Sequence, residues 1–184
     1  MPPFIKNATL HIDMSGSKWL SKKIVILGSP SVGKTSLINQ FVHHKFSEAY
    51  LSTIGLNVVK KTVKVEDYTL DLVLWEVAGQ EKMVENYLKG CEGVIIVIDI
   101  SREESYMSLA AQIESIKKVV PDAEMLVIGN KKDLLEPEKL ATIMANMPIP
   151  PNYLSSAKSG ENVEACFLNL GTSLVEKHKK RNKE

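Results

Sequence analysis

The fold of this chain is decided by the stretch Gly28-Ser29-Pro30-Ser31-Val32-Gly33-Lys34-Thr35. It follows an apolar run at residues 24–27 and precedes residues 35–43, which have the apolar spacing of a helix. Its pattern is G-x-x-x-x-G-K-[ST], a loop whose backbone N–H groups point toward phosphate oxygens. The positive end of the following helix adds to that attraction. The stretch therefore predicts a phosphate-binding loop between a strand and a helix, and the alternative is a chance glycine-rich turn.

The side chains of this loop have separate expected roles. Lys34 would reach the β- and γ-phosphates of a nucleotide, and the hydroxyl of Thr35 would ligate Mg²⁺. The residues expected to contact the nucleotide here are Ser31, Val32, Gly33, Lys34, Thr35 and Ser36. The loop does not say which base the nucleotide carries.

A second turn, about a hundred residues later, indicates the base. Asn130-Lys131-Lys132-Asp133 directly follows the apolar run Val127-Ile128-Gly129. Guanine presents two N–H donors on the edge where it differs from adenine, and the carboxylate of Asp133 can accept from both. The amide of Asn130 can meet the N7 side or tie the loop together. Alone this is a common surface turn, but together with the phosphate loop it favours GTP or GDP as the ligand.

Length and composition suit one globular domain, since 184 residues with 44% hydrophobic content can bury a core. The net charge of +1 is unevenly distributed. The last eight residues hold five lysines and arginines and one glutamate, so this tail carries +4 and the remainder about −3. A slightly acidic body argues against nucleic-acid binding.

The cysteines and the apolar runs bear on the compartment. Cys91 and Cys166 lie far apart in apolar contexts, which indicates buried free thiols rather than a disulfide or a metal site. No apolar run approaches the ~18 residues of a membrane span, and no secretory signal pattern begins the chain. We expect a cytoplasmic protein, with peripheral membrane attachment through partners left open.

Strand-like and helix-like segments alternate along the chain. Strands are expected at 23–27, 58–65, 68–75, 94–98, 125–128 and 152–154, and helices at 35–43, 106–120, 138–146 and 163–174. This order predicts an α/β fold with a six-stranded, mostly parallel sheet, one antiparallel edge strand from a hairpin, and helices on both faces. Ligand is expected at the carboxyl ends of the strands, where both turns lie.

Three regions are expected. Residues 1–21 form an N-terminal extension, interpreted as a surface arm with an amphipathic membrane helix as the alternative. Residues 22–176 form the nucleotide-binding domain, and residues 177–184 form a basic tail. The tail is interpreted as a solvated helix end, and the alternative is weak, salt-sensitive contact with an anionic membrane.

Five motifs in a familiar order resemble the Ras superfamily of small GTPases, with the Ras and Rab branches closest, over about residues 22–176. Beside the two turns above, they are Phe46 to Gly55, which resembles switch I, Trp75 to Glu81, which resembles switch II, and Ser156-Ala157-Lys158. The resemblance implies the P-loop NTPase G domain. It also implies a GDP/GTP switch with slow intrinsic, Mg²⁺-dependent hydrolysis. Effectors, exchange factors and GTPase-activating proteins would bind at the two switches.

The resemblance also assigns roles in the switches. In switch I, Phe46 would cover the guanine face, Tyr50 would close over the phosphates, and Thr53 would complete the Mg²⁺ site and touch the γ-phosphate. In switch II, Gly79 would offer its N–H to the γ-phosphate, and Gln80 would orient the attacking water. Gln80 and Lys34 are thus the expected catalytic residues.

Around the base and the metal, the resemblance assigns five further residues. Lys131 would lay its aliphatic stem along the base, and the backbone N–H of Ala157 would read guanine O6, with Ser156 and Lys158 beside it. Glu76 would join Thr35 and Thr53 at Mg²⁺.

Four departures from the family pattern stand out. Pro30 replaces the glycine usual in Ras-type members, where a side chain crowds the catalytic glutamine and any incoming arginine. Glu76 replaces an aspartate, and its extra methylene carries the carboxylate about 1.5 Å further, so it can bind Mg²⁺ directly or displace a water. The segment 81–90 is about three residues shorter than in Rab proteins. No cysteine follows Cys166, so no prenylation is expected.

Two other functions stay open. Pro30 and Glu76 favour a GTP-binding interaction module with negligible hydrolysis, and an ATP-using P-loop enzyme is disfavoured by residues 130–133. The only arginines are Arg102 and Arg181, neither of them in a switch, so we expect no arginine near the site and slow intrinsic turnover.

Overall fold

The computed structural model describes residues 11–12, 18–47, 55–77 and 81–183. Its centre is a sheet in the order β3-β4-β2-β5-β6-β7. The strands are β2 (Lys18–Leu27), β3 (Leu56–Val65), β4 (Tyr68–Val77), β5 (Gly93–Asp99), β6 (Glu124–Asn130) and β7 (Tyr153–Leu154). Only β3 is antiparallel to its neighbour on this path. The predicted six-stranded sheet is confirmed, and a two-residue strand, β1 (His11–Ile12), adds an antiparallel partner to β2.

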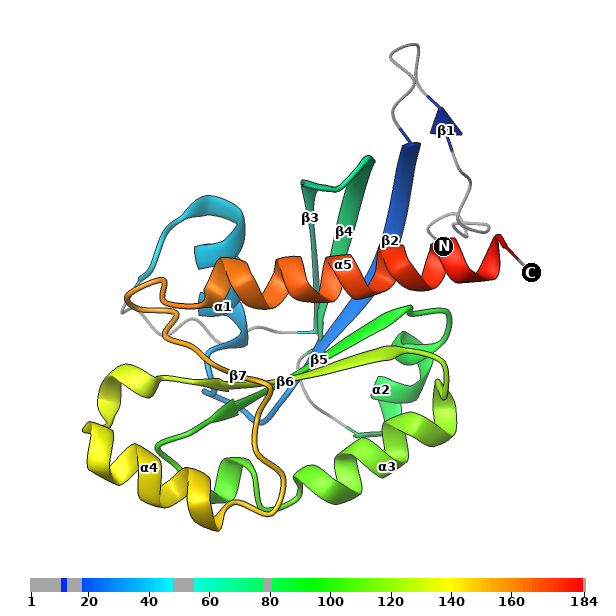
Figure 1. Ribbon diagram of the computed structural model, residues 1–184. Helices are drawn as coiled ribbons and strands as arrows, with labels where there is room; N and C mark the ends of the chain where they lie inside the picture. Colours follow the sequence, from blue (N-terminus) through cyan, green and yellow to red (C-terminus); the bar gives the residue numbers. More distant parts are fainter. Residues whose placement is uncertain (1–10, 13–17, 48–54, 78–80, 184) are drawn as a thin grey trace.

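Helices cover both faces of the sheet (Figure 1). One layer holds α1 (Lys34–His43) and α5 (Val163–Arg181), and the other holds α2 (Glu81–Leu88), α3 (Leu109–Val119) and α4 (Pro137–Asn146). The period of two in a strand explains the two cores, because Ile24 and Ile26 of β2 face one layer while Val25 and Leu27 face the other. All seven residues of β5 are buried, as expected for a central parallel strand.

The hairpin β3–β4 has the burial pattern that its alternating leucines predict. Leu70, Leu72 and Leu74 of β4 are fully buried, as predicted, in the core that α1 and α5 share. In that core Phe41 of α1 stacks on Phe167 of α5, with ring centroids 4.0 Å apart. Both cysteines are buried free thiols, as the sequence indicated.

Some boundaries differ from expectation. β2 begins at Lys18, inside the extension predicted to end at residue 21, because residues 18–22 pair with Tyr68–Leu72 of β4. The sequence left residues 81–90 unassigned, and they contain α2. The helix expected at 106–120 begins at Leu109, after a short 3-10 turn (Glu103–Ser105).

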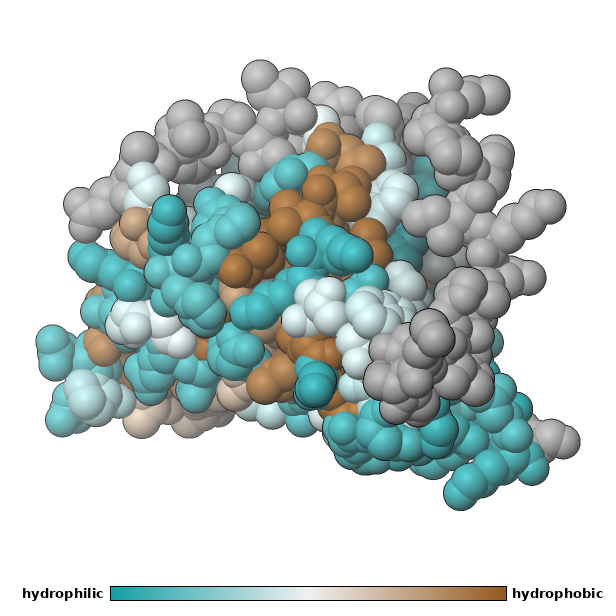
Figure 2. Space-filling view, turned by 90° about the horizontal axis from the view of Figure 1, so that it is seen from above, coloured by the Kyte–Doolittle hydropathy of each residue, from teal (hydrophilic) through white to brown (hydrophobic). Residues whose placement is uncertain are grey.

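The basic tail continues α5 as far as Arg181. Lys177 bonds the carbonyl of Asp122 and pairs with Glu124 at 2.9 Å, and Lys179 pairs with Glu66. Seen from above, a band of hydrophobic residues crosses the middle of the molecule, and the surface at the lower right is hydrophilic (Figure 2). Within the described ranges, no helix has the length and apolar character that a membrane crossing needs.

Candidate functional site

The phosphate loop turns between β2 and α1, and its backbone conformation requires glycine at two positions. Gly28 has φ +144° and Gly33 has φ +97°, values that L side chains rarely adopt. A Cβ on Gly28 would lie 2.2 Å from the carbonyl oxygen of Val97, and one on Gly33 would lie 2.4 Å from Asn130 Nδ2. Ser31 also has positive φ, at 65°. Residues with positive φ, set among residues without it, can turn nearby N–H groups toward one concavity, which suits an anion.

Lys34 is held over this loop. Its ammonium donates to the carbonyls of Gly28 (2.8 Å) and Ser29 (3.1 Å), and the residue is 8% exposed. Burial lowers the pKa of Lys34, and the nearby Glu76 carboxylate counteracts part of that effect. The bonds stretch the side chain back along the loop, where it can meet phosphates bound in the concavity.

Two of the three residues predicted for the metal, Thr35 and Glu76, come together through sheet pairing, and the third, Thr53, lies outside the described residues. Glu76 of β4 lies opposite Ile26 of β2, so it reaches the first turn of α1, and it is 1% exposed. The Thr35 hydroxyl donates to the Glu76 carboxylate in a short hydrogen bond, and Asn57 Nδ2 donates to it at 3.2 Å.

These oxygen donors fit Mg²⁺, which is usually held by one or two carboxylates together with substrate phosphates and water. In the described part of the chain, no group of three or more His, Cys, Asp or Glu side chains forms a separate metal cluster. Of the described residues, Thr35 and Glu76 would hold the ion, beside the phosphates.

The base-recognition turn sits beside the phosphate loop, because β2 and β6 are parallel and both end at the same edge. Asn130 joins the two: its Nδ2 donates to the carbonyl of Val32 at 3.0 Å, across 98 positions of sequence. Its Oδ1 accepts from the backbone N–H of Ala157 at 3.0 Å and from the Ser155 hydroxyl at 3.4 Å. Asn130 is 1% exposed, so these bonds fix three loops against one another.

The acceptor expected for guanine is exposed but held. The hydroxyl of Ser156 donates to Asp133 Oδ1 at 2.6 Å, which sets the direction of the carboxylate. Lys131 has φ 65°, and its ammonium lies 2.8 Å from Asp99 Oδ2. The N–H of Ala157, predicted to read guanine O6, donates to Asn130, so a guanine would have to share this donor.

The switch residues are only partly described. Tyr50, Thr53, Gly79 and Gln80 lie outside the described residues, and their roles stay predictions. Phe46 is 38% exposed at the end of the described segment 18–47. Lys158 is exposed beside Ala157, and Ser36 is in the first turn of α1.

One expectation is wrong: an arginine does lie at the phosphate loop. Arg102 Nη2 donates to the carbonyl of Pro30 at 3.1 Å, and Nε donates to Asp99 Oδ2 at 3.1 Å. Arg102 reaches the loop because the segment after β5 folds back over it. The position of an arginine along the sequence does not reveal such a contact.

Asp99 is a second residue at the site that the sequence analysis missed. A carboxylate ending the apolar strand Val94–Ile98 needs a partner when buried, and that signal could have marked it.

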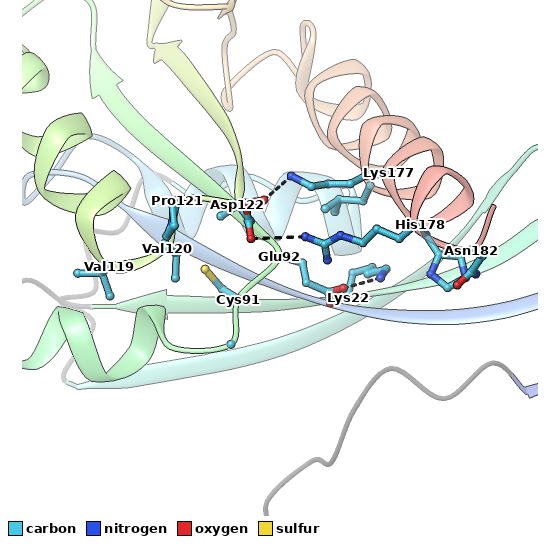
Figure 3. Close-up of a pocket in the computed structure, with 14 residues that line it drawn as sticks. Lys22, Cys91, Glu92, Val119, Val120, Pro121, Asp122, Lys177, His178 and Asn182 are labelled. Carbon is cyan, nitrogen blue, oxygen red and sulfur yellow. Dashed lines mark hydrogen bonds and ion pairs between the residues drawn. The ribbon is translucent and has the colours of Figure 1, made fainter. Parts of the chain in front are cut away.

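A separate hollow of about 590 Å³ lies at the amino-terminal ends of β5 and β6, the end of the sheet away from these motifs (Figure 3). Lys22, which is 4% exposed, pairs with Glu92 at 2.5 Å in its wall, and Lys177 and Arg181 of α5 line it. None of the nucleotide- or metal-binding residues predicted from sequence is among the residues that line this hollow.

Comparison with known proteins identifies the family of the chain. Residues 23–176 match the Ras family. The chain is 33% identical to Ras-related protein RABD2a of Arabidopsis thaliana, over 84% of this chain and 80% of that protein. It is 35% identical to Ras-related protein Rab-4B of Homo sapiens, over 84% and 76%. It is 32% identical to Ras-related protein Rab-7b of Bos taurus, over 90% and 88%. The chain therefore belongs to the Ras family, as a Rab-like small GTPase.

Proposed function

We propose that this GTP-binding switch protein hydrolyses GTP slowly, with Mg²⁺, and that partners sense its switches in the GTP-bound state. The observation that carries the proposal is the Asn130 side chain, which ties the phosphate loop to the two turns predicted to read guanine. One purine nucleotide can then span both ends of the site. Phosphoryl transfer needs positioning and charge neutralisation more than covalent chemistry, and this site is built for both.

The described residues have the following roles. The N–H groups of residues 31–36 and the Lys34 ammonium receive the phosphates, and Lys34 neutralises charge that develops between the β- and γ-phosphates. Thr35 and Glu76 would hold Mg²⁺, which would supply further charge neutralisation on the phosphates. Asp133, oriented by Ser156, accepts from the guanine edge. We propose that Gln80 positions the attacking water.

Turnover without a partner is slow in this proposal, because Arg102, the arginine at the site, is engaged by the Pro30 carbonyl and by the Asp99 carboxylate. A partner supplying an arginine would accelerate hydrolysis by a factor on the order of 10³–10⁵.

We assign effector, exchange-factor and activator contacts to residues 46–55 and 75–81. We propose a cytoplasmic location, and membrane contact through partners.

The test is to denature the purified protein and identify the released nucleotide by chromatography. We expect guanine nucleotide, mostly the diphosphate, and adenine nucleotide alone would refute the assignment. An Asp133→Asn variant should shift preference from guanine toward xanthine, because the amide turns one acceptor position into a donor. Single-turnover hydrolysis should be slower in Gln80→Leu, and equal rates would remove Gln80 from the mechanism.

A second candidate is a GTP-binding interaction module with negligible hydrolysis. The observation that favours it is the contact between Thr35 and Glu76, in which the longer carboxylate lies against the hydroxyl expected to ligate Mg²⁺ and can take the place of a water on the ion. If the protein retains GTP unhydrolysed for hours in Mg²⁺, this candidate replaces the first.

A further inference from the structure

Asp99, at the carboxyl end of β5, is a buried carboxylate that receives two cations. The residue is 1% exposed and pairs in register with Asn130 of β6. Its Oδ2 lies 2.8 Å from the Lys131 ammonium and 3.1 Å from Arg102 Nε. Its Oδ1 accepts from the backbone N–H of Ser101 at 3.1 Å and from the Ser101 hydroxyl at 2.6 Å.

The electrostatics indicate that the carboxylate is ionised. Burial raises the pKa of Asp99, but hydrogen bonds from Lys131 and Ser101 outweigh burial, and the pKa stays below its ordinary value. A buried charge of this kind persists only when it is paired and hydrogen-bonded. Each of its partners is therefore held in place by a strong interaction.

The two cations belong to opposite ends of the candidate nucleotide site. Lys131 is part of the base-recognition turn. Arg102 uses its second nitrogen, Nη2, to donate to the carbonyl of Pro30 in the phosphate loop at 3.1 Å. Proline has no N–H and a fixed φ, so its carbonyl is the only backbone group at this position that can anchor the loop. Asp99 thus connects the phosphate loop, through Arg102, with the base-recognition turn, through Lys131.

The segment that carries Arg102 is itself fixed. The Ser105 hydroxyl donates to the Asp99 carbonyl at 2.8 Å and accepts from the Asp99 N–H at 3.0 Å, and Ser105 is buried. The Arg102 N–H donates to the Asp99 carbonyl at 3.0 Å. The arginine side chain is 38% exposed, and Glu104 at 3.8 Å is its second charged neighbour, after Asp99. The guanidinium therefore approaches Pro30 from a rigid base.

We propose that Asp99 and Arg102 form a brace that holds the phosphate loop against the base-recognition turn and so slows release of the bound guanine nucleotide. This inference rests on the proposed function. Arg102 and Asp99 act through the loop and through Lys131, so both are positioning residues. Arg102 contacts the phosphate loop and not the base-recognition turn. Its loss should therefore weaken binding of the β-phosphate more than binding of the base.

The experiment measures dissociation of a fluorescent GDP analogue from the full-length protein after addition of excess GDP. We expect Arg102→Gln to release it about tenfold faster, equivalent to about 1.4 kcal/mol. The release rate of Arg102→Lys should fall between those of the wild type and Arg102→Gln, because one ammonium does not reproduce the contacts that a guanidinium makes to two partners at once. Asp99→Asn should be at least as fast as Arg102→Gln, because it loosens both ends. Lys118→Gln is the matched control, since Lys118 pairs at 2.8 Å with Glu114 on the exposed face of α3, and it should change the rate by less than twofold.

A second measurement separates positioning from general destabilisation. The ratio of the affinities for GDP and GMP reports contacts to the β-phosphate, so this ratio should fall in Arg102→Gln. A generally destabilised protein would instead lose affinity for both nucleotides alike. A wild-type release rate or an unchanged GDP/GMP ratio in Arg102→Gln would overturn the brace. If the wild-type protein retains no guanine nucleotide, the proposed function itself fails. If it does retain it and Arg102→Gln behaves identically, only the brace fails.

Discussion

Replacing Asn130 by alanine tests whether one buried amide holds the nucleotide site together. The side chain is 1% exposed and makes two well-formed bonds to backbone groups, from Nδ2 to the Val32 carbonyl and to Oδ1 from the Ala157 N–H, each 3.0 Å. Alanine leaves both backbone groups without this partner. A buried group left unpaired costs about 1–3 kcal/mol, so we expect the free energy of unfolding to fall by about 2–6 kcal/mol. That is a large share of the roughly 5–15 kcal/mol typical of a domain.

The assay is urea unfolding followed by circular dichroism, together with GDP binding by calorimetry. The affinity of Asn130→Ala for GDP should fall at least ~30-fold, because the variant loses about 2 kcal/mol of the hydrogen bonding that holds the loops of the site together. The control is Asn146→Ala, since the Asn146 amide donates to the Thr142 carbonyl at 2.8 Å on the exposed face of α4. The control should stay within about 0.5 kcal/mol of wild type. A loss below about 1 kcal/mol in Asn130→Ala, or one no larger than the control's, would refute this account of the site.

Three further outcomes are expected. Gly28→Ala should destabilise the fold by about 2–4 kcal/mol in urea unfolding, because its Cβ would lie 2.2 Å from the rigid Val97 carbonyl oxygen. Glu76→Gln should raise several-fold the Mg²⁺ concentration needed to retain GDP in a titration, since the carboxylate beside Thr35 loses its charge. Burial raises the pKa of Cys91 to about 11 and that of Cys166 to about 12, from an ordinary 9.0. Both thiols should therefore resist Ellman's reagent in the native protein at pH 8. Their contribution to stability is fully present below pH 9 and is lost as pH rises toward 11, because the unfolded thiols ionise first, and unfolding midpoints measured from pH 8 to 10.5 should show that decline.

Regular elements were predictable where local spacing reports burial directly. The apolar runs of β5 and β6 and the alternating leucines of β4 identify strands because a side chain's direction in a strand depends only on its position along the chain. The glycines of the phosphate loop were predictable for the same local reason, since their positive φ is a property of the backbone at those residues.

Other features depended on pairing between distant segments. The start of β2 at Lys18 follows from its register with β4, and a strand's partner does not appear in its own residues. The Ala157 N–H, assigned to guanine O6, donates to Asn130 because β6 and the turn after β7 lie together. The expectation of no arginine at the site was wrong because it relied on the positions of the arginines along the chain, and not on their positions in the folded protein.

The amino-acid sequence by itself therefore determined the class of fold and the positions of the two turns, and it predicted which residue types would meet phosphate, metal and guanine, because each of these depends on short runs of neighbouring residues. Only the tertiary structure decided which distant side chains support those turns. Asp99 is the clearest case: its ordinary place at the end of a strand becomes a junction only when Lys131 and Arg102 fold onto it, since charges act through distance in space.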